Sequence, residues 1–267
     1  MRLSSSLVKT YKRCRRLYEL KYLEDLTPVQ KAEDLQDGTD YHAGVERFYK
    51  EGCFFPDMTR PKISAMVRAY IDYVAMNMPE LYTVKYSEKW FDYKLTPNHS
   101  VVGICDAIAL DGLPVEHKTT SNEINEDYVY NLQWDEQILT YMLANGVNEM
   151  YYTVIRKPTI RQKQNETEEQ FYERCLLWYA EDTERKIKVF KVTRSQQEVA
   201  VHRENLLILA EEIENCKHFY RNPCMCNLYG RRCEYASVCL DYNPELEYIE
   251  FEKKKKVTEE KQENELF

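Results

Sequence analysis

The 267-residue sequence has little glycine, with only seven residues of this type. Sandwiches and barrels depend on many tight turns, and glycine is the residue that enters left-handed backbone conformations without steric cost. The shortage therefore disfavours an all-β fold and favours helices around a modest sheet. Hydrophobic residues make up 43% of the chain, which is enough to build a substantial core.

The sequence also lacks a long apolar run. No segment approaches the roughly 20 apolar residues that a membrane-spanning helix needs. The first residues, MRLSSSLVKTYK, lack the apolar centre of a secretory signal. We therefore expect a cytoplasmic protein. Because disulfides are rare in that compartment, metal ligation explains a cluster among the nine cysteines better than a disulfide framework does.

An overall positive charge is absent as well. The formal net charge is −8, which by itself argues against a nucleic-acid-binding protein. Local patches decide binding, however, and one segment concentrates basic side chains: Lys9, Lys12, Arg13, Arg15, Arg16 and Lys21. A second group, Arg156, Lys157, Arg161 and Lys163, follows an expected strand. Both groups are candidate phosphate-binding surfaces, and the alternative is that they are ordinary solvated charge runs.

Hydrophobic periodicity predicts an α/β fold. Apolar residues recur at helical spacing over 4–22, 38–51, 62–77, 126–145, 165–182 and 195–216. Alternation and β-branched residues predict strands over 86–96, 100–110, 113–120, 149–157 and 186–194. This order indicates a central mixed β-sheet flanked by helices. The highly charged segment 246–267 shows no periodicity, and we expect it to be a disordered tail.

Charged residues lie inside two of these expected strands, on either side of an Asp111-Gly112 turn. Asp106 is in the first strand, and Glu116 and Lys118 are on one face of the second. The turn brings Asp106 towards Glu116, and two adjacent carboxylates repel each other unless a cation lies between them. Mg²⁺ and Mn²⁺ prefer such oxygen ligands. The alternative is an exposed hairpin carrying an ordinary Glu–Lys pair.

This spacing resembles a known nuclease signature. Asp106, followed ten positions later by Glu116-His117-Lys118, is similar to the D…(D/E)-x-K motif of the PD-(D/E)XK nuclease superfamily. The sequence differs at His117, where the family commonly has an apolar residue, and no proline precedes Asp106. The resemblance implies a restriction-endonuclease-like core and hydrolysis of phosphodiester bonds.

Two further motifs resemble those of the RecB-type branch of this superfamily. In NLQWDEQILTYML, the residues Gln133, Gln137 and Tyr141 are four apart and resemble a Q-x-x-x-Y motif. GTDYHAGVE places His42 like the metal-binding histidine of a G-x-x-x-H motif.

The resemblance assigns a role to each of these residues. It implies that Mg²⁺ or Mn²⁺ is bound by His42, Asp106, Glu116 and the backbone carbonyl of His117. Lys118 would position the attacking water. Gln137 and Tyr141 would steady this lysine or the DNA backbone.

Four cysteines are clustered near the end of the chain: Cys224, Cys226, Cys233 and Cys239. Their spacing alone predicts a local four-thiolate site for zinc or iron–sulfur. The chain also resembles AddB and CRISPR-adaptation nucleases, which combine one N-terminal and three C-terminal cysteines. That resemblance implies a 4Fe–4S cluster on Cys14, Cys226, Cys233 and Cys239, with Cys224 surplus or an alternative ligand. Such ligation would hold together one nuclease domain over 1–245.

The resemblance as a whole implies a metal-dependent DNA exonuclease that acts on single-stranded DNA or DNA ends. A phage or CRISPR-related recombination or repair setting follows from it, with recombination or CRISPR-adaptation proteins as partners and the cytoplasm of a bacterial or phage-infected cell as location. The expected DNA-binding residues are Lys12, Arg13, Arg15, Arg16, Arg231 and Arg232. Two alternatives stay open: a non-catalytic DNA-binding recombination partner with a degenerate nuclease fold, and a structural protein clasped by zinc.

Overall fold

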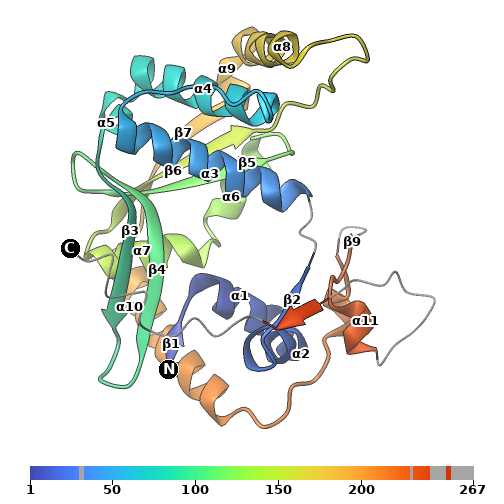
Figure 1. Ribbon diagram of the computed structural model, residues 1–267. Coiled ribbons are helices and arrows are strands. Elements are labelled where there is room, and N and C mark those ends of the chain that lie inside the picture. The colour runs from blue at the N-terminus through green and yellow to red at the C-terminus, as the bar shows by residue number, and fades with distance from the viewer. Residues whose placement is uncertain (30–32, 229–230, 241–250, 254–267) are drawn as a thin grey trace. The chain divides into compact units, whose positions relative to one another are not determined.

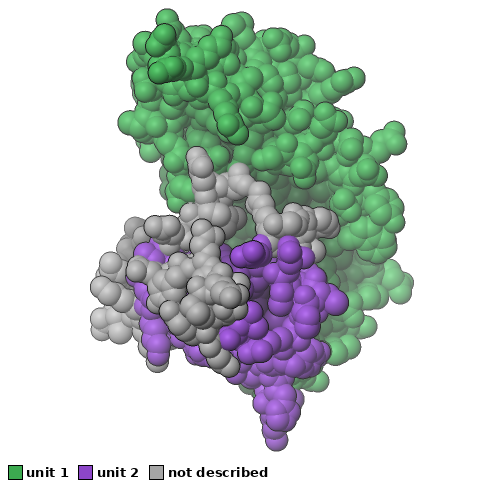
Figure 2. Space-filling view, turned by 90° about the vertical axis from the view of Figure 1, so that its right-hand side faces the viewer, with its two compact units in different colours: residues 1–5, 33–214 green, residues 6–32, 215–267 purple. Residues whose placement is uncertain are grey.

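The computed structural model describes residues 1–29, 33–228, 231–240 and 251–253 (Figure 1). The chain divides into two compact units, coloured separately in Figure 2. Unit 1 consists of Met1–Ser5 and Glu33–Glu214, and unit 2 consists of 6–32 and 215–267. None of the helices in the described ranges has the length and apolar character that crossing a bilayer requires.

Unit 1 is built on a mixed six-stranded sheet, which confirms the predicted fold class. The strand order is β1-β4-β5-β6-β7, and β3 runs along the other edge of β4. β1 pairs with β4 and β5 with β6 in parallel, and the remaining pairs are antiparallel. The strands are β1 (Arg2–Leu3), β3 (Val84–Lys94), β4 (Ser100–Ala109), β5 (Pro114–Thr120), β6 (Glu149–Arg156) and β7 (Ile187–Thr193).

One edge of β4 is shared between two short partners. β1 pairs with Ser100 and Val101, whereas β5 pairs only with Ala107 and Ile108. Between these contacts, residues 102–106 have no strand partner on this edge among the described residues. β4 and β5 therefore separate just beyond their common turn, and this separation is where the charged residues of both strands lie.

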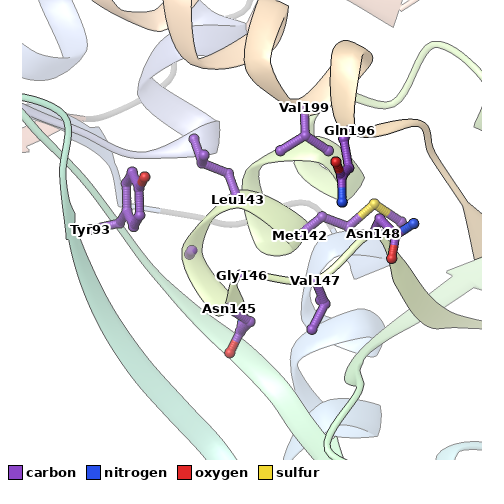
Figure 3. Close-up of a pocket in the computed structure, with 10 residues that line it drawn as sticks. Tyr93, Met142, Leu143, Asn145, Gly146, Val147, Asn148, Gln196 and Val199 are labelled. Atoms are coloured by element: carbon purple, nitrogen blue, oxygen red, sulfur yellow. The ribbon is translucent and has the colours of Figure 1, made fainter.

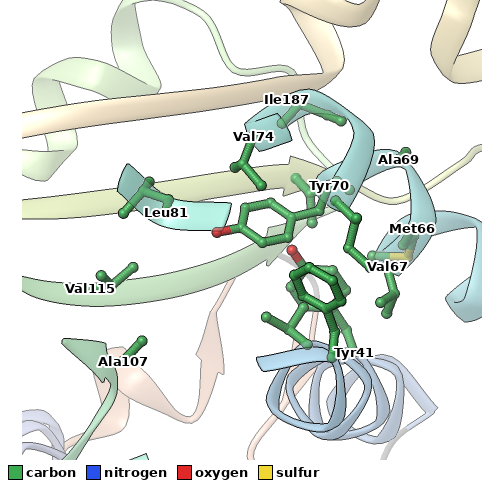
Figure 4. Packing of buried hydrophobic residues seen from close by; sticks show 14 of the residues in the cluster. Tyr41, Met66, Val67, Ala69, Tyr70, Val74, Leu81, Ala107, Val115 and Ile187 are labelled. Carbon is green, nitrogen blue, oxygen red and sulfur yellow. The ribbon is translucent and has the colours of Figure 1, made fainter. Parts of the chain in front are cut away.

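Helices cover the sheet and form the main core with it. Aromatic and aliphatic side chains of α3 and α4 pack on β4, β5 and β7, with Tyr41 and Tyr70 at the centre (Figure 4). α7 contacts β3, β4, β5 and β6, and Thr140 of α7 hydrogen-bonds His202 of α10 at 2.9 Å. The helices of unit 1 are α3 (Glu33–Glu51), α4 (Pro61–Asn77), α5 (Pro79–Tyr82), α6 (Glu126–Leu132), α7 (Glu136–Asn145), α8 (Glu168–Glu181), α9 (Thr183–Lys186) and α10 (Gln196–Asn215).

The predicted helix over 126–145 is two helices. α6 ends at Leu132, and α7 starts after Asp135, whose side chain accepts a 3.1 Å hydrogen bond from the backbone N–H of Gln137. The first backbone N–H groups of a helix have no partner within the helix. The side chain of Asp135 accepts a hydrogen bond from one of them, which allows a new helix to begin here. As a result, Gln133 caps the end of α6 and does not share a helix with Gln137.

Unit 2 combines both ends of the chain. Its N-terminal part contains α1 (Ser5–Arg13), α2 (Arg15–Tyr18), the π-helix η1 (Glu19–Leu23) and β2 (Leu26–Pro28). Its C-terminal part contains the 3₁₀ helix η2 (Pro223–Met225), β8 (Asn227–Leu228), β9 (Arg231–Arg232), α11 (Ala236–Cys239) and β10 (Phe251–Lys253). Leu17, Leu20 and Tyr235 form its small core.

Part of the expected disordered tail is ordered, because β10 pairs with β2 in an antiparallel ladder. Phe251 also packs against Tyr235, with ring centroids 5.1 Å apart. The charge pattern did not reveal this strand, since a three-residue pairing is too short to produce periodicity. The rest of the expected tail, 246–250 and 254–267, lies outside the described residues.

The predicted helix over 4–22 breaks at Cys14, which has an extended backbone with φ −163°. Asn222 holds this break from the other end of the chain. Its backbone N–H points to the Cys14 Sγ at 3.4 Å, and its side-chain amide donates a 2.9 Å hydrogen bond to the carbonyl of Arg13. These long-range contacts replace helical hydrogen bonds at this point, and they turn the cysteine towards the C-terminal segment.

Candidate active site

Asp106 and Glu116 lie opposite each other where β4 and β5 separate. The pairing of Ala107 with Val115, extended by one residue, places the two carboxylates side by side on the same face. The Asp106 Oδ2 accepts a 2.7 Å hydrogen bond from the backbone N–H of His117. This carboxylate therefore satisfies an amide that the separating strand leaves without a ladder partner.

Glu116 is buried, with 3% of its surface exposed, and its two oxygens differ. The Oε1 atom accepts hydrogen bonds from Lys118 Nζ and, at 3.0 Å, from Gln137 Nε2. The Oε2 atom is buried and accepts no hydrogen bond from any described residue. Burial, and then the charge of Asp106, raise the pKa of Glu116 to about 7.

A hydrogen-bonded chain from α7 orients Lys118. The Tyr141 hydroxyl donates to the carbonyl of Ile104 at 2.6 Å and so accepts from Gln137 Nε2, at 2.9 Å. This fixes the amide of Gln137, whose Oε1 then accepts from Lys118 Nζ at 3.1 Å. Burial opposes the charged form of Lys118, but Glu116 raises its pKa, so the ammonium stays protonated. The structure thus brings Gln137 and Tyr141 to the lysine, as the motif implies.

His42 reaches the same carboxylate from α3. Its Nδ1 lies 3.3 Å from Asp106 Oδ1. Burial lowers the pKa of His42, but the hydrogen bond and charge of Asp106 outweigh it and raise that pKa. In the same way, burial opposes ionisation of Asp106, while His42 and then His117 lower the pKa of its carboxyl group. The imidazole therefore lies within ion-pairing distance of the carboxylate, where a bound cation would compete with its proton.

The side chain of His117 points to the face of β5 opposite Glu116 and Lys118, as strand alternation predicts, and its ring centroid lies 6.3 Å from that of His42. Its Nδ1 lies 2.5 Å from Thr153 Oγ1, and its Nε2 lies 3.4 Å from the Tyr49 hydroxyl. Burial lowers the pKa of this imidazole to about 4, so it is neutral. Metal ligation by the backbone carbonyl of His117 stays a prediction.

The donor set of this site fits a hard divalent cation. Among the described residues, no three His, Cys, Asp or Glu side chains are close enough as they stand to hold a metal ion. Two basic side chains contact these carboxylates, namely Lys118 on Glu116 and His42 on Asp106. The unpartnered Oε2 of Glu116 is nevertheless the kind of buried acceptor that a cation satisfies, and two carboxylates with one imidazole suit Mg²⁺ or Mn²⁺.

In unit 2, the predicted cluster ligands come together. A cavity of about 60 Å³ is lined by Cys14, Cys226, Cys233 and Cys239, with Leu17, Leu20 and Tyr235 among its other walls. All four thiols are free. Cys224 is exposed and does not line this cavity, which leaves it outside the group. The backbone N–H of Cys233 donates to the carbonyl of Cys226 at 2.8 Å, which holds these two residues next to each other.

The structure places two polar residues beside this cavity that the sequence analysis did not assign to it, Asn222 and Arg13. Asn222 directs its N–H to Cys14 Sγ, and only the folded chain brings these residues together. Arg13, expected to bind DNA, instead lines the cysteine cavity and donates to the carbonyl of Met225 at 3.4 Å. Its Nε is buried and has no acceptor among the described residues. Arg13 therefore lies beside the cysteines, and DNA binding by this residue stays a prediction.

The other expected DNA-binding residues differ in how available they are. Arg15 lies over the rings of Tyr11 and Tyr220, 5.3 Å and 4.9 Å from their centroids. Arg16 pairs with Glu19 and, at 3.0 Å, with Glu24, so part of its charge is already balanced. Lys12 and Arg232 are exposed, and the side chain of Arg231 lies outside the described part of the chain.

The second basic segment does not form a continuous exposed surface. Lys157 is buried, and its ammonium lies 3.7 Å from Asp37. Arg156 is 3.7 Å from Glu123. Only the later residues, Arg161 and Lys163, are exposed. The expected phosphate-binding role of this segment is therefore wrong for Lys157.

One pocket of unit 1 lies away from the carboxylates. It measures about 520 Å³ and surrounds the end of α7, between Gly146 and the start of α10 at Gln196 (Figure 3). None of its lining residues belongs to the predicted site. The candidate active site is identified by the chemistry of its residues, and this pocket is separate from it.

Comparison with known proteins agrees with this geometry. Residues 2–240 match the family model of the PD-(D/E)XK nuclease superfamily. The match spans most of the chain, and the chain belongs to this superfamily. A search of curated proteins found no match.

Searches of solved structures found distant likenesses. An alkaline exonuclease from Laribacter hongkongensis is 13% identical, with a TM-score of 0.36 over 80% of this chain and 90% of that one. A phage-related exonuclease from Haemophilus somnus is 13% identical, with a TM-score of 0.35 over 78% and 94%. The protein SSO0001 is 11% identical, with a TM-score of 0.40 over 82% and 87%. These likenesses are too weak to transfer a substrate or a role.

Proposed function

We propose that this protein is a metal-dependent DNA exonuclease that hydrolyses phosphodiester bonds in single strands or at DNA ends. The observation that carries the proposal is the pair of opposed carboxylates, Asp106 and Glu116, with a protonated Lys118 beside a buried oxygen that has no partner among the described residues. Membership of a nuclease superfamily supports the reaction class.

The residues of the site divide the work of hydrolysis. His42, Asp106, Glu116 and the carbonyl of His117 would hold Mg²⁺ or Mn²⁺, which when bound polarises the phosphodiester and lowers the pKa of water. Lys118 is held by Gln137 so that its ammonium stays beside the carboxylates, where it orients water and offsets charge on the phosphate. Tyr141 fixes the amide that holds the lysine.

The cysteines support a 4Fe–4S cluster in unit 2. Four thiols around one cavity match the ligand number of such a cluster. Each thiolate of the cluster binds a different iron atom, so the sulfurs stay further apart than around a single zinc ion with Zn–S bonds of about 2.3 Å. That separation agrees with four thiols that line a cavity without forming a tight group. The unpaired Nε of Arg13 offers a hydrogen bond to sulfur.

The biological setting follows from the same proposal. A nuclease that acts on single strands or DNA ends suits phage or CRISPR-related recombination and repair, in which DNA ends or displaced single strands arise. Exposed aromatic residues on β3, Tyr86 and Trp90, lie on the face that carries Asp106 and offer surfaces on which single-stranded bases can stack.

The test uses DNA labelled at either end, in single- and double-stranded form, with Mn²⁺, Mg²⁺ or EDTA. We expect metal-dependent release of short products from one end, because an exonuclease removes nucleotides stepwise. The Lys118→Ala variant should lose at least about a hundredfold in rate. Lys191→Ala, on the half-exposed lysine of the edge strand β7, is the matched control and should keep full activity. If Lys118→Ala degrades DNA like the wild type, the protein is a DNA-binding relative without this chemistry.

A further inference from the structure

Glu88 occupies an unusual position in the middle of β3. Its backbone is in the left-handed region, with φ +49°, which an L-residue other than glycine seldom adopts inside a strand. The residues on either side stay in regular register, Ser87 with Ala107 and Lys89 with Cys105. The backbone of Glu88 therefore lies across from that of Asp106, between these two pairs.

The register places three carboxylates in one row across three strands. Glu88 on β3 opposes Asp106 on β4, and Asp106 opposes Glu116 on β5. The row is one of backbone positions, because the left-handed backbone of Glu88 interrupts the side-chain alternation of a regular strand. A third acidic residue therefore lies beside Asp106, on the side away from Glu116.

The electrostatic surroundings agree with this placement. Glu88 is half-buried, and burial raises the pKa of its carboxyl group, followed by the negative charges of Asp106 and Glu46. The charge of His42 acts in the opposite direction. The charges of two predicted metal-binding residues, Asp106 and His42, therefore act on Glu88. It makes no hydrogen bond or ion pair within the described chain that would explain why a glutamate occupies this position.

A separate observation indicates that this row of carboxylates serves a ligand. The Oε2 of Glu116 is buried and has no donor among the described residues, although Glu116 is only 3% exposed. An ordinary acidic cluster on a surface would leave its oxygens to water. A row of carboxylates that ends in a buried unpartnered oxygen is stabilised by a cation.

We propose that Glu88 is a further ligand of the divalent cation bound at Asp106, contacting it from the β3 side. This rests on the proposed metal-dependent function. Glu88 adds negative charge near Asp106, so it increases affinity for Mg²⁺ or Mn²⁺. None of the nuclease motifs in the sequence includes this residue.

The test measures Mn²⁺ binding to the full chain by calorimetry, without DNA, and the melting temperature with and without Mn²⁺. We expect Glu88→Gln to bind Mn²⁺ at least about tenfold more weakly. Its metal-free melting temperature should equal or exceed that of the wild type, because a repulsive charge is removed. Glu51→Gln, which removes the same charge from an exposed position at the end of α3, should bind like the wild type.

Asp106→Asn separates this inference from the function on which it depends. If Asp106→Asn abolishes Mn²⁺ binding but Glu88→Gln binds normally, the site exists and Glu88 is not a ligand. If neither substitution changes binding, the proposed metal site itself fails. A Glu88→Gln variant that melts well below the wild type without metal, and shows the wild-type gain with Mn²⁺, assigns Glu88 a structural role and overturns the inference.

Discussion

The carboxylate of Asp106 accepts a 2.7 Å hydrogen bond from the backbone N–H of His117, the residue between Glu116 and Lys118. This contact bridges β4 and β5 where their regular pairing stops. It also sets the spacing of Asp106, Glu116 and Lys118, because it fixes Asp106 to the backbone of the strand that carries the other two. The candidate site therefore lies at the point where β4 and β5 separate.

The link from Tyr141 to Lys118 predicts a graded effect of mutation. Tyr141→Phe removes the hydroxyl that orients the Gln137 amide, so the lysine loses its fixed partner. We expect kcat to fall about 10- to 100-fold while KM changes little, because supporting groups of a metal site have effects of this size. Tyr130→Phe removes a hydroxyl from an exposed tyrosine on α6 and should leave kcat unchanged. Equal rates for the two variants would contradict a positioning role.

The pKa of Glu116 predicts how metal binding depends on pH. Burial and Asp106 raise this pKa from 4.5 to about 7, so protons compete with the cation below neutrality. Mn²⁺ affinity should fall by up to about tenfold for each pH unit below 7. In the metal-free protein, the raised pKa favours folding at low pH, and this contribution disappears as pH rises through about 7.

The Glu116→Gln variant isolates this group. This variant should bind Mn²⁺ weakly at every pH. Between about pH 5 and 8, its metal-free stability should decrease less than that of the wild type, because it lacks the carboxyl group whose pKa is about 7. Calorimetric titrations and thermal melts over this span measure both effects. A wild-type affinity that does not change with pH would show that Glu116 is ionised throughout.

The cysteine cavity predicts which thiols are needed for the cluster. Cys14→Ser should lose iron and sulfide, because Cys14 lines the cavity, whereas Cys224→Ser should keep about four iron atoms per chain. Anaerobic purification, metal analysis and visible absorbance measure the result. A colourless wild-type protein that contains zinc would instead support the structural clasp, and loss of iron from Cys224→Ser would show that Cys224 is a ligand.

Gly103 predicts a packing constraint beneath the site. A β-carbon at this position would lie 2.7 Å from the ring of Phe91, which packs edge-on against Tyr141. Gly103→Ala should therefore cost about 1–3 kcal/mol of unfolding free energy. Gly38→Ala, in α3, meets only an ordinary 3.6 Å contact and should stabilise the protein by about 0.5–1 kcal/mol. Denaturant unfolding compares them, and a Gly103→Ala variant as stable as the wild type would contradict the packing.

Much of unit 1 was predictable because its strands carry strong local patterns. The turn at Asp111-Gly112 and the alternation around Glu116 predicted the β4–β5 hairpin and the face on which its charges lie. The four-residue spacing of Gln137 and Tyr141 predicted their common helical face, although Asp135 starts a new helix that the apolar pattern concealed. Local periodicity predicts which residues share one face of a helix or strand, but it does not show where a capping residue ends one helix and starts the next.

The remaining features depend on contacts between distant segments. Cys14 leaves the helical conformation because of Asn222, and Glu88 meets Asp106 only through the register of β3 and β4. Arg13 was expected on a phosphate-binding surface, but it lies beside the cysteines. A sequence shows that these residues are charged or reactive, and folding decides which partners they receive.

The central claim is that a cation held between Asp106 and Glu116 drives phosphodiester hydrolysis. The most direct measurement is the rate of nucleotide release from end-labelled DNA by wild-type and Asp106→Asn protein, across a Mn²⁺ titration and in EDTA. The account predicts release by the wild type that rises with Mn²⁺ and stops in EDTA, and no release by a folded Asp106→Asn variant at any concentration. Release by Asp106→Asn at the wild-type rate, or undiminished release in EDTA, would contradict it.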